Sequence, residues 1–231
     1  MRADSPAWRW DQVLLEPEFS SLIPEDGIVG FLKSGIAEIG RRGLDIGCGN
    51  GRHTLAALGC GFQMAAVDIS ITALSNTGKL VREHGHDALL LAASMDALPF
   101  EDEVFDFVMS FCVLNHGEKT QFLGALLESF RVLRTGGMAY GFVMTQDDPR
   151  FGHGVNAGEN CYVFTEGLEA GIPHYFPERR QLLDVLSRLG HVVKFNPVRC
   201  DAEEIRRIHP IASYSAHVEF VVQKRRARLS R

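Results

Sequence analysis

The sequence lacks several features that mark particular classes of protein. No apolar run approaches the ~20 residues that a helix needs to cross a bilayer. The first residues are polar and include Trp8 and Trp10, where a secretory signal would have an apolar segment. No two of the five cysteines lie at CxxC spacing, so we expect reduced thiols, no disulfide framework and a cytoplasmic protein.

An excess of one charge is also missing. The 24 lysines and arginines face 29 acidic residues, which gives a net charge of −5 and favours neither a nucleic-acid partner nor a membrane partner. The tail from Lys224 to Arg231 is basic, and we interpret it as a solvated chain end. There are no repeats, and 231 residues with 45% hydrophobic content suit a single domain over 1–231. The oligomeric state stays open.

After an N-terminal arm (1–26) with one short helix, strand-like and helix-like patterns alternate along the chain. Helices are predicted at Gly27–Ile39, Arg52–Gly59, Ile71–His84, Gln121–Leu133 and Pro177–Leu189. Strands are predicted at Gly43–Gly47, Gln63–Ile69, Ala88–Ala92, Phe105–Phe111, Met138–Thr145, His191–Pro197 and His217–Lys224. This alternation predicts a Rossmann-like, doubly wound α/β fold with a mostly parallel seven-stranded sheet and helices on both faces.

Two segments depart from the alternation. The last two strands have only a loop around Asp201–Ile211 between them, so we expect an antiparallel strand at that edge of the sheet. Residues 146–176 are rich in glycine, asparagine and histidine and end in Gly171-Ile-Pro-His-Tyr-Phe176. A segment this long without a clear period is usually functional, and we expect a lid or a substrate-side insertion.

The most informative stretch is Leu44-Asp-Ile-Gly-Cys-Gly-Asn-Gly-Arg52, which joins a strand to a helix. Glycines at 47, 49 and 51 allow a tight turn and the close approach of a ligand to the backbone and to the helix N-terminus. Arg52 stands where the dinucleotide fingerprint needs glycine or alanine, so a pyrophosphate fits poorly. Asp45 suits a cationic amine instead, such as that of a methionine moiety.

Two further acids follow the next two strands. Asp68 lies 19 residues past Gly49, where an acid in Rossmann-like folds accepts hydrogen bonds from ribose hydroxyls. The alternative is a helix cap, because Ser70 follows. Asp96 can accept from an exocyclic amine of adenine, and Met95 can pack on the purine.

Taken together, these segments resemble the class I S-adenosylmethionine-dependent methyltransferases, over roughly residues 30–145. The matching motifs are Asp45-x-Gly-x-Gly-x-Gly51, Asp68, Asp96 before Leu98-Pro-Phe100, Phe105-Asp-Phe-Val-Met-Ser110 and Phe130-Arg-Val-Leu-Arg-Thr-Gly-Gly137. A weaker likeness through residues 171–176 is to small methyltransferases of the tellurite-resistance type, and it says little about substrate. No Asn-Pro-Pro-Tyr-like tetrapeptide follows Phe111, which disfavours amino-methylation of DNA bases or glutamine.

The resemblance implies S-adenosylmethionine as the cofactor and a role for each matching residue. Asp45 and the backbone of Gly47 would hold the methionine end, and Asp68 would bind the ribose. Ile69, Met95 and Asp96 would frame the adenine, and Phe111 would lie near the sulfonium. The predicted cofactor set is Asp45, Gly47, Cys48, Gly49, Gly51, Asp68, Ile69, Met95, Asp96 and Phe111.

The acceptor should approach beyond the fourth strand. His116 is the candidate general base there, and the alternative is a histidine that shapes the pocket. Asn115, His174 and Tyr175 complete the predicted acceptor-side set. For His174 and Tyr175 a turn that packs its aromatic side chains on the sheet is an equal alternative. The irregular spacing of His153, Cys161 and His174 argues against a metal, so none is predicted.

The sequence therefore predicts transfer of a methyl group to a small-molecule acceptor by in-line displacement. Two other functions stay open: a non-catalytic module that binds S-adenosylmethionine or its product, and a nicotinamide-dependent oxidoreductase. Arg52 and Asp45 disfavour the oxidoreductase. Ordinary packing and a lid are equal alternatives for Trp8 and Trp10.

Overall fold

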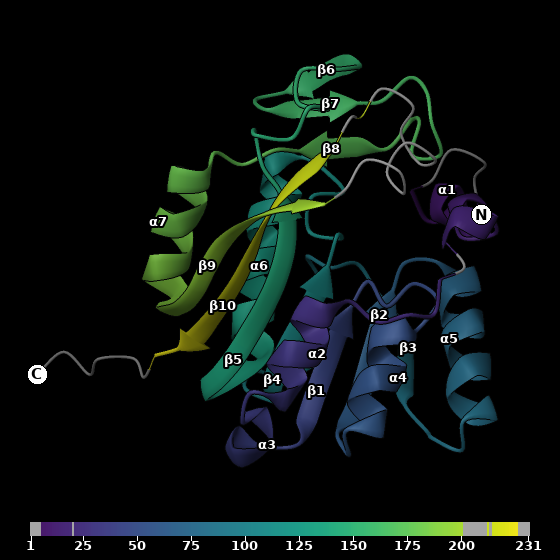
Figure 1. The fold of residues 1–231 in the computed structure, drawn as a ribbon, viewed down its shortest axis with the longest axis vertical. Helices are drawn as coiled ribbons and strands as arrows, with labels where there is room; N and C mark the ends of the chain where they lie inside the picture. The colour runs from purple at the N-terminus through teal and green to yellow at the C-terminus, as the bar shows by residue number, and fades with distance from the viewer. Residues whose placement is uncertain (1–5, 20, 201–211, 213, 226–231) are drawn as a thin grey trace, which may run out of the picture.

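The computed structural model describes residues 6–19, 21–200, 212 and 214–225. Seven strands form one sheet in the order β3-β2-β1-β4-β5-β10-β9 (Figure 1). They are β1 (Arg42–Ile46), β2 (Gln63–Asp68), β3 (Leu89–Ala92), β4 (Phe105–Phe111), β5 (Leu133–Met144), β9 (Gly190–Cys200) and β10 (Ser215–Lys224). β10 pairs antiparallel with β5 and β9, and the pairs among the first five strands are parallel. The predicted fold class is confirmed, with β10 lying just inside the edge strand β9.

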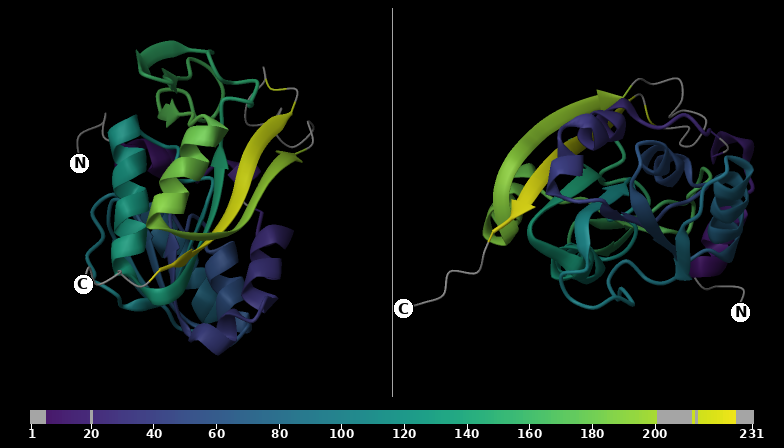
Figure 2. Two further views of the ribbon diagram at one scale, coloured as in Figure 1. Left: turned by 90° about the vertical axis from the view of Figure 1, so that its left-hand side faces the viewer. Right: turned by 90° about the horizontal axis from the view of Figure 1, so that it is seen from below.

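Helices cover both faces of this sheet, as the view from below in Figure 2 shows. The helices of the domain are α2 (Asp26–Lys33), α3 (Ile36–Ile39), α4 (Arg52–Gly59), α5 (Ile71–Glu83), α6 (Lys119–Val132) and α7 (Arg179–Leu189). On one face, Phe107 of β4 is fully buried and its ring meets the edges of the Phe31 and Phe62 rings. None of the helices in the described ranges has the length and apolarity that crossing a membrane requires.

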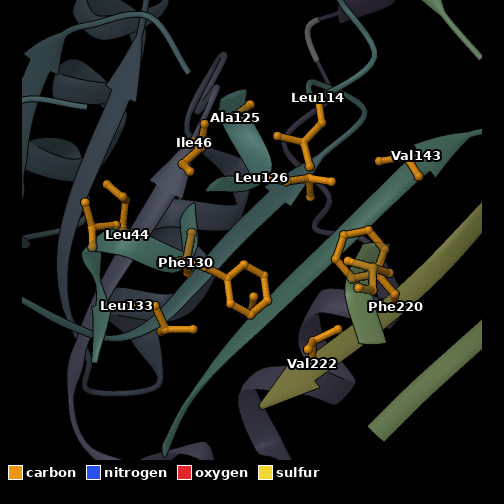
Figure 3. Close-up of a cluster of buried hydrophobic side chains, with 14 of the residues drawn as sticks. Leu44, Ile46, Leu114, Ala125, Leu126, Phe130, Leu133, Val143, Phe220 and Val222 are labelled. Atoms are coloured by element: carbon orange, nitrogen blue, oxygen red, sulfur yellow. The ribbon is translucent and has the colours of Figure 1, made fainter. Parts of the chain in front are cut away.

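The opposite face is packed by α6 and α7. Figure 3 shows Leu126 and Phe130 of α6 gathered with side chains of β1, β5 and β10. The helical spacing of these residues puts them on one side of α6, while the exposed Leu127 faces away from this cluster. Burial on both faces explains why Phe107, Val108 and Met109 of β4 are consecutive apolar residues that do not alternate with polar ones.

Most element bounds agree with the sequence prediction to within a few residues. The helix predicted over 27–39 is instead two helices, because Gly35 has a φ of +85° and breaks the helical path. No helix lies between β3 and β4, where residues 93–104 form turns. The predicted loop 201–211 and the tail residues 226–231 lie outside the described residues.

Residues 146–176 form a second, three-stranded antiparallel sheet of β6 (Val155–Gly158), β7 (Cys161–Val163) and β8 (Pro173–Tyr175). It lies beyond the carboxyl end of β5, at the top of Figure 1. At its base, the buried carboxylate of Asp148 accepts hydrogen bonds from Arg150 Nε at 2.7 Å, from Ser215 Oγ at 2.9 Å and from the Ala216 amide at 2.8 Å. This buried ion pair joins the small sheet to the start of β10.

Two short helices precede the domain: α1 (Pro6–Val13) and the 3-10 helix η1 (Pro17–Phe19). α1 lies over the end of α5 at the same edge of the large sheet as the small sheet (Figure 1). Ligands of open parallel sheets bind outside the carboxyl ends of the strands. α1 and the small sheet therefore flank the carboxyl ends of the parallel strands, where a ligand is expected. This side of the sheet is called the ligand edge below.

Candidate active site

The loop between β1 and α4 has the backbone that its glycines predict. Gly47, Gly49 and Gly51 have φ values of +71°, +53° and +85°, which side chains other than glycine rarely adopt. A Cβ atom on Gly47 would come within 2.3 Å of Val113, and one on Gly51 within 2.8 Å of Thr77. The first and third glycines are therefore required by packing within the protein.

Gly49 differs from the other two glycines because its outer face is open. A Cβ atom there would meet only the Leu14 side chain, at 3.9 Å. The Gly49 amide donates to Asp68 Oδ2 at 3.0 Å, which fixes the loop against the end of β2. The middle of the loop thus offers bare backbone that a ligand can touch, beside a carboxylate.

Asp45 lies beneath this loop and is 2% exposed. Its Oδ2 accepts from the Thr54 hydroxyl at 2.6 Å, at the first turn of α4. Burial raises the pKa of Asp45 to about 7, and the nearby charge of Asp68 raises it further. The carboxyl therefore changes charge near neutral pH, and a cation close by would favour its ionised form. Its described contacts are with the protein, so its contact with a ligand amine stays a prediction.

Asp68 lies at the end of β2, beside both the glycine loop and the start of α5. Its Oδ1 accepts from the Ser70 amide at 2.9 Å and its Oδ2 from the Gly49 amide, while burial raises its pKa. The side chain is half-buried, and a carboxylate has further lone pairs for hydroxyl donors. The cap of α5 is Ser70, whose hydroxyl accepts from the Ala73 amide. Asp68 is thus free of the capping role that the sequence offered as its alternative.

The segment after β3 continues the same edge. The Ala93 amide donates to the carbonyl of Asp68 at 3.1 Å, which ties this segment to the end of β2. Asp96 is half-buried and accepts from the Ser94 hydroxyl, and Met95 packs against the core beneath. Asp68 therefore ends β2, and Met95 and Asp96 follow the neighbouring strand β3, as predicted.

Phe111 ends β4 beside the start of α4. Its ring stacks on Phe142 at 4.5 Å and lies 5.1 Å from the His53 ring, with the Arg52 guanidinium 5.5 Å away. The next residue, Cys112, has a φ of +54°, an uncommon value for a residue with a side chain. Strained backbone of this kind clusters at functional sites, which supports a role for the end of β4.

α1 covers this edge of the sheet and contacts both the start of α5 and the loop after β4. The Asp11 carboxylate accepts from the Ser70 hydroxyl at 2.6 Å and from the Thr72 amide at 3.0 Å. The Trp10 ring lies 4.5 Å from the His116 ring. Trp10 thus packs against a residue of the predicted acceptor side, and its role as a lid stays a prediction. No motif in the sequence had pointed to Asp11.

On the far side α1 also reaches the small sheet. The Arg9 guanidinium donates to the carbonyl of Ala170. The helix thus spans from the turn after β2 to the loop before β8. This span encloses the edge between the glycine loop and the end of β4.

The loop after β4 pairs with β8. His116 lies opposite His174 in an isolated antiparallel bridge. On one side of the bridge the Tyr175 amide donates to the Asn115 carbonyl at 2.8 Å, and on the other the Gly117 amide donates to the Pro173 carbonyl at 2.8 Å. Two segments far apart in the sequence are thus joined beside the expected acceptor position.

Three of the predicted acceptor-side residues, Asn115, His174 and Tyr175, are buried. Asn115 is fully buried, and its amide donates to the Met144 and Tyr175 carbonyls while its oxygen accepts from the Met144 amide. It fastens β4, β5 and β8 together and does not face a substrate. Tyr175 is also buried, with its ring packed on Phe122.

An acidic residue, Glu169, lies close to both histidines. Glu169 is 7% exposed and lies just before β8. Its Oε1 is 3.7 Å from His116 Nε2 and its Oε2 is 3.2 Å from His174 Nε2. Glu169 was not predicted from the sequence, because no motif or period connects it to either histidine. His153, in contrast, is exposed and lies outside this group.

Comparison with known proteins agrees with this arrangement. Residues 44–137 match a family model described as a methyltransferase domain. No curated protein matches the sequence.

Solved structures with similar folds are distant in sequence. A SAM-dependent methyltransferase from Methanosarcina mazei is 20% identical, with a TM-score of 0.68 over 80% of this chain and 93% of that chain. The cyclase SpnF is 17% identical, with a TM-score of 0.68 over 97% of each chain. A 1,6-didemethyltoxoflavin-N1-methyltransferase from Burkholderia thailandensis, solved with 1,6-didemethyltoxoflavin and S-adenosylhomocysteine, is 19% identical, with a TM-score of 0.59 over 87% of this chain and 80% of that chain.

These identities establish a shared fold and leave the reaction open, because one fold hosts many functions. The strand order, the glycine loop and the position of the matched residues all agree with that fold. Residues 44–137 thus match a methyltransferase domain, and the chain shares its fold with solved SAM-dependent methyltransferases.

Proposed function

We propose that this protein uses S-adenosylmethionine to methylate a small-molecule acceptor. One observation carries the proposal: the open backbone at Gly49 lies beside the carboxylate of Asp68 within the matched methyltransferase domain. Bare backbone admits close approach of a ligand, and the carboxylate accepts from hydroxyl groups. These are the properties that an adenosyl ligand requires.

In this proposal each part of the edge binds one part of the cofactor. Asp68 receives the ribose hydroxyls, and Asp45 in its ionised form attracts the amine. The half-buried Ile69, Met95 and Asp96 lie where the adenine would be framed. Phe111, with the Arg52 guanidinium beside its ring, ends β4 next to the reacting centre. The remaining loop residues, Gly47, Cys48 and Gly51, shape the turn.

The bound cofactor supplies a methyl group that positive charge on sulfur already activates. The protein's work is then to align the acceptor and to exclude water. α1 and the small sheet cover the edge, and Trp10 lies against His116. A covered edge of this kind favours a small acceptor over a macromolecule.

His116 is the residue that we propose for taking up the acceptor's proton. It is half-buried, follows the end of β4, and has the Glu169 carboxylate 3.7 Å from its Nε2. A carboxylate at this distance stabilises the imidazolium that forms when the ring accepts a proton. His174 is fully buried behind it and supports the base without meeting the acceptor.

A second function rests on the likeness to SpnF. That protein is a cyclase, and its fold matches this chain over 97% of its length. The fold therefore also serves a reaction other than methyl transfer, and the second function that we propose is binding of S-adenosylmethionine or its product without methyl transfer. The oxidoreductase alternative is weaker, because Arg52 is held by Glu25 at 3.3 Å in the position of the fingerprint's third glycine.

Calorimetry and a turnover assay test the proposal. S-adenosylhomocysteine should bind and NAD should not. Asp68→Ala should weaken this binding by about 1–3 kcal/mol, the worth of a charge-assisted hydrogen bond. Asp184→Ala, which removes an exposed acid on α7, should leave it unchanged. NAD binding, or full affinity in Asp68→Ala, would contradict the proposal.

Turnover separates the two functions. A panel of small acceptors is incubated with cofactor labelled in its methyl group. His116→Ala should slow transfer while sparing affinity for S-adenosylhomocysteine. Equal loss of both would make His116 a structural residue. Binding without transfer to any acceptor would favour the second function.

A further inference from the structure

Two imidazoles and one carboxylate converge where the loop after β4 meets β8. The side-chain ligand atoms of His116, Glu169 and His174 all lie within 4.8 Å of one another. Each of these groups binds transition metals in proteins, and two histidines with one carboxylate are a frequent set. In the described part of the chain this is the group whose atoms are close enough to share an ion.

The hydrogen bonds of His174 indicate that a cation lies beside its Nε2 atom. Its Nδ1 is 2.9 Å from the carbonyl oxygen of Ile172, and a carbonyl only accepts, so Nδ1 carries the proton. In the neutral ring, Nε2 then presents a lone pair to the Glu169 carboxylate, 3.2 Å away. The lone pairs of the imidazole nitrogen and of the carboxylate oxygen repel each other unless a proton or a metal ion lies between them.

The same arrangement resembles the outer shell of known metal sites. Histidines that bind a metal commonly donate their other ring N–H to a backbone carbonyl, which fixes the tautomer and the ring orientation. His174 makes this bond, and its ring is stacked on Phe164 at 4.4 Å. Its ligand nitrogen is therefore oriented in advance.

The backbone holds the three ligands in place. His116 and His174 face each other across a bridge that is fixed by pairings on both sides, at Asn115–Tyr175 and at Gly117–Pro173. Glu169 is held through its own backbone, since the Ile172 amide donates to its carbonyl at 3.1 Å. Rigid, buried ligands reduce the ordering that ion binding requires.

We propose that His116, Glu169 and His174 bind one divalent transition-metal ion. Three protein ligands leave coordination positions for an outside ligand, as in catalytic zinc sites. The site lies at the end of β4, where the acceptor is expected to approach. An ion here would engage the lone pair of His116, so His116 would be the base only in the metal-free protein. The metal site stands whether or not the protein transfers methyl groups.

The test uses the full chain, stripped with a chelator and titrated with Zn²⁺ by calorimetry. A parallel titration with Co²⁺ reports the ligands through its visible absorption. The background carries Cys60→Ser, which removes an exposed thiol that could bind zinc. We expect one ion per chain and a cobalt spectrum without thiolate ligation.

Three variants assign the ion to these residues. Glu169→Gln keeps the shape of the side chain but not its charge, and should weaken zinc binding on the order of 100-fold, as should His174→Ala. His153→Ala removes an exposed histidine of the same segment and should bind zinc like the parent. If His174→Ala does not fold, Glu169→Gln decides.

The metal site would be overturned by any of three results. These are the absence of one-to-one binding, a cobalt spectrum with thiolate ligation, and a zinc affinity of Glu169→Gln equal to that of the parent. Binding of S-adenosylhomocysteine is measured separately on the metal-free protein. Failure of the metal site and failure of the proposed function are therefore distinguishable.

Discussion

Gly49 and Gly35 share a backbone conformation but differ in what surrounds them. Both have positive φ, and a methyl group on either would meet no atom closer than 3.9 Å within the protein. Alanine at either position should therefore cost a similar ~1 kcal/mol of stability through strain. Gly49→Ala should also abolish binding of S-adenosylhomocysteine, because its methyl group fills the open face of the loop.

Gly35→Ala is the matched control, since Gly35 lies between α2 and α3, away from this loop. Calorimetry and thermal melts on both variants separate strain from lost binding. Equal affinity in the two variants would show that no ligand passes over Gly49.

Single residues also show where sequence reasoning succeeds. The glycines and Asp68 could be placed because a strand, a turn and a helix follow each other locally, and their backbone is as predicted. Asn115 could not be interpreted correctly, because its partners Met144 and Tyr175 are 29 and 60 residues away. Polar side chains that bond distant backbone carry no local signal.

At the scale of elements, side chains of α1 attach this helix to the domain. Asp11 attaches it to the start of α5, through Ser70 and Thr72. Asp11→Ala should cost about 1 kcal/mol of stability, because it removes two hydrogen bonds at a partly exposed position. It should also speed the release of S-adenosylhomocysteine several-fold, since Leu14, the residue that follows α1, is the side chain nearest to the open face of Gly49.

Stopped-flow dissociation measures this effect, and hydrogen exchange over residues 6–13 reports the release of the helix. Glu16→Ala removes an exposed acid just after the same helix and should change neither. An unchanged dissociation rate in Asp11→Ala would mean that α1 does not cover the ligand.

Elements with a strong period were predictable, and those without one were not. The helix Arg52–Gly59 and the strand Phe105–Phe111 have the predicted bounds, because each is long enough to show its pattern. The strands of the small sheet have three or four residues each and pair antiparallel within 155–175. Such short strands show no alternation, so the sequence indicated only a functional insertion.

At the scale of the whole molecule, buried titratable groups set the response of stability to pH. Burial lowers the pKa of His53 and of His217 to about 3. Between about pH 6.5 and pH 3 the unfolded chain then binds more protons than the folded one, so stability is lost as pH falls. Asp45 acts in the opposite sense, because its folded carboxyl keeps a proton up to about pH 7.

Two variants should therefore change the pH profile in opposite directions. His217→Gln should flatten the loss of stability on the acid side, and Asp45→Asn should steepen it, each by up to ~1.4 kcal/mol per pH unit. Urea denaturation at about pH 5 and about pH 7.5 measures the free energy of unfolding. Parallel profiles for the two variants would show that neither group titrates as its burial implies.

The bridge between residues 115–117 and 173–175 has a consequence for how ligands exchange. Because it fastens β8 to the loop after β4 by main-chain bonds, the small sheet and the end of β4 move as one body. α1, in contrast, is attached to this edge mainly through side chains. Entry and departure of small molecules should accordingly take place by displacement of the N-terminal helix, while the residues of the predicted acceptor side keep their arrangement.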